Sequence, residues 1–88
     1  MAIRYLPETL RETAVVNSLR IATLIAYLTR TADILSADIE HEETRAGVRD
    51  LADPAYPVLA RSLMERRENV GATIGSLEAL IQGTPKAA

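Results

Sequence analysis

The chain contains no cysteine, tryptophan or phenylalanine, and its only aromatic residues are three tyrosines. Without cysteine, neither a disulfide nor a thiolate zinc site can stabilise the fold. Small domains that lack such cross-links rely on well-packed helices or on association with another chain. Because aromatic residues are so scarce, the core of this 88-residue chain must be aliphatic.

A strong excess of either charge is also missing. Ten basic and twelve acidic residues leave a net charge of −2, whereas a nucleic-acid-binding protein needs a concentrated basic face. The most apolar run, Ile21 to Leu28, is far shorter than the ~20 residues that span a bilayer. The opening segment MAIRYLPETL has no apolar signal-peptide core and no lysine-rich face for a membrane surface. We therefore expect a cytoplasmic protein that binds neither nucleic acid nor membranes.

Proline and glycine are rare, and their positions predict two helices. After Pro7 neither occurs until Gly47, which follows a C-terminal turn containing Arg45, so the first helix should cover about 7–46. The second helix should cover about 54–82, because Asp53 before Pro54 is typical of a helix N-cap and Gly83 terminates the pattern. Pro57 would remove the first hydrogen bond of such a helix, so a start at Pro57 after a preliminary turn is the alternative. The sequence predicts a single all-α domain, a two-helix antiparallel hairpin with flexible ends at 1–6 and 83–88.

Apolar residues in both helices follow the alternating three- and four-residue steps of a coiled-coil seam. If the loop sets the register, facing residue numbers should sum to roughly 102, since both helices rise equally per residue. The expected facing pairs are Ile21 with Ile81, Ile25 with Leu77, Leu28 with Ile74, Ala32 with Val70, Leu35 with Arg67, and Ile39 with Leu63. A charge at the seam position of Arg67 could fix register, lay its stem over the core or bind an anion, and Asp38 is its expected partner.

Small residues line one side of this predicted hairpin. Ala22 and Ala26 each follow a seam residue, as do Gly71 and Gly75, so all four should share a flat side that we call the small-residue face. Glycine in a helix costs about 1 kcal/mol relative to alanine, and close docking of another helix would offset that loss. The alternative is that both glycines are merely tolerated.

The first helix is apolar nearly all round between Ala14 and Leu28, with Arg20 as its only charge. A helix of that kind is buried by several neighbours, and a lone hairpin would expose too large an apolar patch. A homodimer forming a four-helix bundle is the simplest remedy, and another helical protein is the alternative cover. The predicted interface residues are Val15, Val16, Leu19, Ala22, Ala26, Gly71 and Gly75.

The segment SADIEHEE holds the only histidine. Asp38, His41 and Glu42 share one side of the first helix, a weak likeness to the Glu-x-x-His spacing of metal-binding bundles, to which Glu65 and Glu68 could add oxygens. We nevertheless predict no metal site and expect a solvated acidic helix end, with Arg45 and either Arg49 or Arg61 compensating its charge; the metal site is the alternative.

No catalytic triad, phosphate loop or cofactor motif is present in the sequence, so we predict no catalytic residue, no cofactor and no enzymatic activity. The leading hypothesis is a small bacterial-type adaptor, chaperone or regulatory assembly subunit that acts through its helical surface as a homo-oligomer. The alternatives are a metal-binding four-helix bundle and an antitoxin-like protein that is stable only with its cognate partner.

Overall fold

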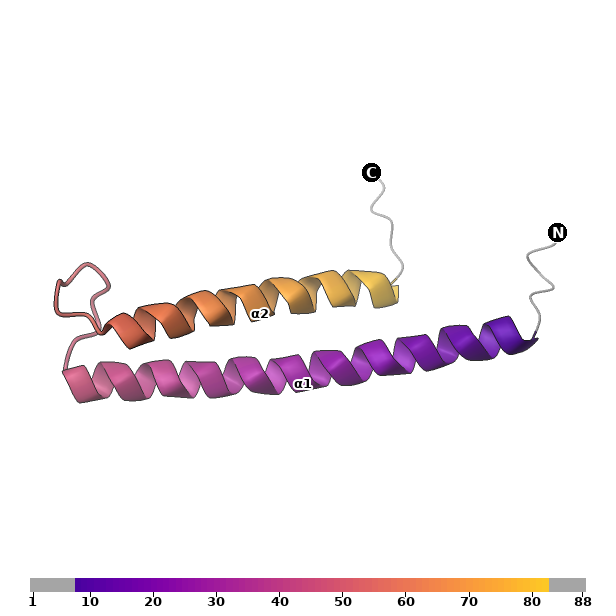
Figure 1. Cartoon of the computed structure of the whole chain (residues 1–88), viewed down its shortest axis with the longest axis horizontal. Coiled ribbons are helices and arrows are strands. Elements are labelled where there is room, and N and C mark those ends of the chain that lie inside the picture. Colours follow the sequence, from indigo (N-terminus) through magenta and orange to yellow (C-terminus); the bar gives the residue numbers. More distant parts are fainter. Residues whose placement is uncertain (1–7, 83–88) are drawn as a thin grey trace.

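The chain folds into two antiparallel helices, α1 (Glu8–Ala46) and α2 (Val58–Gln82), joined by a loop over residues 47–57 (Figure 1). The structure is a computed structural model that describes residues 8–82. Pro7 and the predicted flexible ends, 1–6 and 83–88, lie outside the described residues. The predicted all-α hairpin is confirmed.

The C-terminus of α1 ends at glycine as predicted. Gly47 has φ +73°, a backbone conformation that favours glycine over residues with a side chain. Its N–H donates to the carbonyls of Glu43 and Thr44 at 2.8 and 3.2 Å, and the Val48 N–H donates to Glu43 O at 3.3 Å. These bonds form a Schellman motif, and Val48 packs on the hydrophobic core just beyond it. The chain therefore leaves α1 in a fixed direction.

The second helix starts four residues later than the predicted position 54. Asp53 opens a turn instead of capping the helix: its carbonyl accepts from the Tyr56 N–H at 2.9 Å, and its Oδ1 accepts from the Ala55 N–H at 2.8 Å. Pro57 has no N–H with which to extend a helix back to the Asp53 carbonyl. Pro57 then acts as the N-cap, since its carbonyl accepts the Arg61 N–H at 3.2 Å. The alternative of a preliminary turn was the correct interpretation.

The two helices meet along the predicted seam. Arg67 Nη1 donates to Ser36 Oγ at 3.1 Å, one position from the predicted partner Leu35, so the register agrees with the prediction. Asp38, the expected partner of Arg67, is exposed and makes no ion pair with a described residue. The Ser36 hydroxyl lies on the seam side of α1, whereas Asp38 lies two residues further on and points elsewhere.

Buried residues are confined to the loop end of the seam among the described residues. They are Leu35, Ile39, Tyr56, Ala60 and Leu63. Toward the other end, the seam residues are only partly buried, and Ile81 remains 38% exposed. One helix pair therefore closes a core beside the loop and leaves the seam open farther along.

Candidate interaction surface

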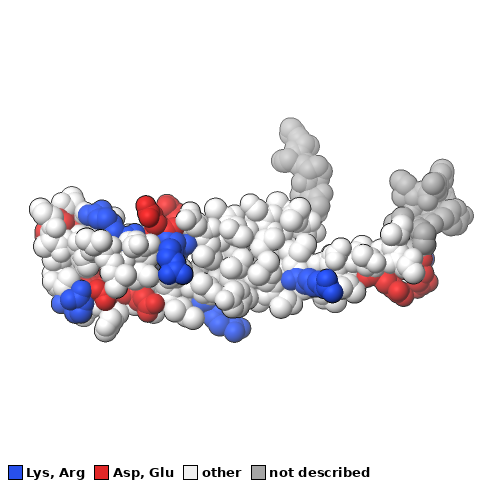
Figure 2. Space-filling model, in the orientation of Figure 1, with Lys and Arg blue, Asp and Glu red and all other residues white. Residues whose placement is uncertain are grey.

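Charge divides the hairpin into two halves. The loop-end half, residues 30–68, carries most of the charged residues, including five in α2 between Arg61 and Glu68. The open-end half comprises residues 8–29 and 69–82. Within it, residues 13–29 contain only Arg20, and residues 69–82 contain only Glu78. On the face shown in Figure 2, blue and red side chains gather beside the loop and red ones lie at the far tip of α1, whereas the stretch between is mostly white apart from blue side chains along α1.

The open-end half also exposes its large apolar side chains. Leu19 and Tyr27 are each 62% exposed and Val15 is 58% exposed. The other exposed large apolar residues of this half are Leu10, Val16, Leu24, Leu80 and Ile81. Exposed apolar surface on a small protein is typical of a site where another molecule binds.

Threonine hydroxyls on this half bond within their own helices. Thr13 donates to Thr9 O at 2.8 Å, and Thr23 donates to Leu19 O at 3.0 Å. Thr73 of α2 donates to Asn69 O at 3.0 Å in the same way. Because each hydroxyl already has an acceptor, a docking partner does not need to supply one. These threonines add little polarity to the surface.

The seven predicted interface residues all lie on the surface of the hairpin, and none is covered by the chain's own described residues. A Cβ built on Gly71 or Gly75 would meet no heavy atom within 4 Å. The packing of α1 on α2 therefore gives no reason for either glycine. A packing reason for both would have to come from outside the described residues.

One further part of α1 stands apart from α2. By the register above, Gln82 comes level with residue 20, so residues 8–19 extend past the end of α2 (Figure 1). We call residues 8–19 the arm. Its exposed apolar residues, Leu10, Val15, Val16 and Leu19, have no part of α2 opposite them within the described residues.

The acidic end of α1 is compensated locally, as predicted. Arg45 pairs with Glu42 at 2.6 Å, and Arg49 pairs with Glu43 at 3.3 Å. The hydrogen bond from Arg45 and its positive charge hold the pKa of the Glu42 carboxyl below its ordinary value. These two arginines offset the unfavourable carboxylates at the helix C-terminus.

Tyr56 joins this charged end to the core. Its ring is buried, and its hydroxyl donates to Glu43 Oε2 at 2.6 Å. That hydrogen bond, followed by burial and the negative charge of Glu43, raises the pKa of the Tyr56 hydroxyl, because ionisation would lose the bond. Arg61 lies over the ring, 5.3 Å from its centroid. The aromatic ring thus ties the loop to both helices.

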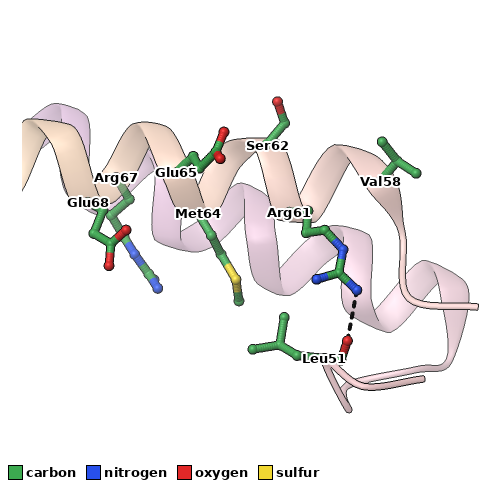
Figure 3. Close-up of a pocket in the computed structure, with 8 residues that line it drawn as sticks. All are labelled: Leu51, Val58, Arg61, Ser62, Met64, Glu65, Arg67 and Glu68. Carbon is green, nitrogen blue, oxygen red and sulfur yellow. Dashed lines mark hydrogen bonds between the residues drawn. The ribbon is translucent and has the colours of Figure 1, made fainter. Parts of the chain in front are cut away.

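A shallow hollow of about 710 Å³ lies where the loop folds beside α2, a feature that the sequence did not predict (Figure 3). Arg61 and Met64 point toward Leu51, whose carbonyl accepts from Arg61 Nη2 at 2.8 Å, whereas Ser62 and Glu65 point away. The complete lining is Leu51, Val58, Arg61, Ser62, Met64, Glu65, Arg67 and Glu68. Arg61 and Arg67 are both held by hydrogen bonds within the chain. We therefore attribute the hollow to the packing of the loop and propose no ligand for it.

The residues of the predicted metal alternative do not come together. Across residues 8–82, no group of three His, Asp or Glu side chains is placed to hold one metal ion. Asp38, His41 and Glu65 are exposed, and Glu42 is occupied by Arg45. Spacing along one helix placed three donors on a side, but the packing of α2 does not complete a ligand set.

Neither described helix is long and apolar enough to cross a membrane. No protein-family model matches the chain, and neither the curated proteins nor the solved structures include a match.

Proposed function

We propose that this chain is a non-enzymatic helical assembly protein that works as a homo-oligomer through its open-end half, in the cytoplasm. In this role it serves as an adaptor, a small chaperone or a regulatory subunit. The observation that carries the proposal is that the least charged stretch of α1 is also one that the chain itself does not bury. The stretch of α1 with almost no charge, residues 13–29, contains no buried residue.

Physical chemistry favours association for such a stretch. Each Å² of apolar surface removed from water contributes roughly 25 cal/mol, so covering several exposed Val and Leu side chains stabilises a complex by several kcal/mol before the entropy of association is subtracted. A two-fold dimer is the simplest cover, since one patch then meets its own copy. Another helical protein is the alternative occupant.

Light scattering across a dilution series tests the proposal. We expect a mass about twice 9.6 kDa that falls on dilution. Leu19→Glu should weaken the dimer by about tenfold or more, because the substitution places a charge in an apolar contact. The matched control is Val58→Glu, which alters an apolar residue that is 81% exposed in the loop-end half and should leave the mass unchanged. A wild-type chain that stays monomeric at every concentration would overturn self-association.

A further inference from the structure

The arm and the small-residue face have complementary shapes. The arm presents the large residues Val15, Val16 and Leu19, whereas the small-residue face of the paired region presents Ala22, Ala26, Gly71 and Gly75. At about 100° per residue, the side of α1 that carries Val15 and Leu19 also carries Ala22 and Ala26. This side is turned away from the seam, so it is available to a second copy.

Charged residues flank that side of α1 at both ends. Arg11 and Glu12 lie before residues 13–29, in which Arg20 is the only charge, and Arg30 and Asp33 lie after them. All four are exposed, and none makes an ion pair with another described residue. When a second α1 is laid antiparallel on the first about a point between residues 21 and 22, Glu12 of one copy comes within one residue of the level of Arg30 of the other. Arg11 of one copy likewise comes within one residue of the level of Asp33 of the other. Parallel pairing would instead place each charge beside its own like.

We propose that two copies associate about a two-fold axis that passes between their α1 helices, level with the peptide bond between Ile21 and Ala22, so that the arm of each copy lies on the small-residue face of the other. The arrangement rests on the self-association proposed above and specifies its geometry. A two-fold interface makes every contact twice, so each copy supplies one arm and one small-residue face. The opposite charges of the residue pairs at the two ends, Arg11 and Glu12 in one copy and Arg30 and Asp33 in the other, fix the antiparallel register.

The lengths of the elements fit this arrangement. The arm covers about 18 Å, and in the proposed register residues 8–19 lie level with residues 24–35 of the second copy. Val15 and Leu19 then lie on either side of the level of the second copy's Ala26, and Val15 lies about level with its Gly75. Close approach at those positions is what small residues on a helix surface permit. The overhang that leaves the arm uncovered in one chain becomes the segment that fills the open end of the other.

A single introduced cysteine tests the register, since the chain has no cysteine of its own. In Ala22→Cys the two sulfur-bearing residues lie almost level across the axis, so mild oxidation should give a disulfide-linked dimer in high yield. In the matched control Ala26→Cys they lie about 13 Å apart along the helices, beyond the ~7 Å limit between Cα atoms of a disulfide. Cross-linking of both variants would indicate a parallel pairing and overturn the proposal.

Exchanging the charges of Glu12 and Arg30 tests the proposed ion pairs independently. Glu12→Arg and Arg30→Glu should each weaken the dimer by about tenfold, and the double variant should recover most of the loss. No recovery in the double variant would overturn the register. The two proposals also fail differently: a wild-type dimer in which Ala22→Cys does not cross-link overturns the arrangement alone, whereas a wild-type monomer overturns the self-association beneath it.

Discussion

The two halves of this hairpin have the same secondary structure and the same seam spacing, yet they bury their residues very differently. The loop-end half contains all five buried residues and both ion pairs among the described residues. The open-end half contains the longer uncharged stretches and, among its described residues, no buried residue. Apolar composition alone therefore does not determine where a core forms.

What closes the loop-end core is a third structural element. Tyr56 and Val48 come from the loop and pack against residues of both helices, so the seam there is covered on more than one side. At the open end only two helices are present, and two cylinders in contact can cover only a stripe of each other. A second copy would provide the missing third side.

The largest expected effect comes from truncating seam residues, which should lower the free energy of unfolding more in the loop-end half than in the open-end half. Leu63→Ala should reduce the free energy of unfolding by about 2–4 kcal/mol, because Leu63 is enclosed by the loop-end core. Leu77→Ala, at an equivalent seam position in the open-end half, should reduce it by about 1 kcal/mol, because Leu77 is only partly buried. Urea unfolding followed by circular dichroism measures both at one protein concentration. Equal losses would mean that the open end is packed as tightly as the loop end.

A medium effect is expected at the two helical glycines. Replacing both Gly71 and Gly75 by leucine should disrupt association while making the chain more helical, since each glycine lowers helix stability by about 1 kcal/mol. The space around both residues within the chain is open, so leucine fits the isolated hairpin. Light scattering and circular dichroism give the two readouts.

The matched control for the glycine variant is Ala72→Leu with Ser76→Leu. Both residues are exposed and keep the four-residue spacing, but they lie about 100° further round α2 than the glycines. This control should keep the wild-type mass. If the leucine variant at 71 and 75 has the same mass and melting temperature as the wild type, close docking on the small-residue face is wrong.

The sequence predicted those features that depend on local rules. Residue spacing predicted the hairpin and its seam, because both follow from the helical period. Gly47 predicted the end of α1, because glycine favours the backbone conformation found there. The start of α2 was misplaced because Asp before Pro suits both a helix N-cap and a turn. The choice between them depends on Pro57, which cannot donate to Asp53.

Contacts made by long side chains were harder to predict than backbone structure. Arg67 bonds to Ser36 and not to Asp38, and Tyr56 bonds to Glu43 across thirteen residues of sequence. Such contacts depend on rotamers and on the path of the loop, which no periodicity specifies. The seven-residue interface remains a prediction for a similar reason, since it depends on a second molecule.

The smallest expected effect concerns acid sensitivity, which should arise from the loop-end half. Arg45 lowers the pKa of Glu42 below its ordinary value, so the pair stabilises the folded chain above that ordinary value and the contribution is lost as the pH falls through the lowered pKa. Glu42→Gln should therefore be slightly less stable than the wild type near pH ~7, and this deficit should shrink near pH ~3. Glu40→Gln is the control, because Glu40 is exposed and makes no ion pair with a described residue. Urea midpoints at both pH values measure the difference. A deficit in Glu42→Gln that persists in acid would show that Glu42 stabilises the helix end by packing and not by charge.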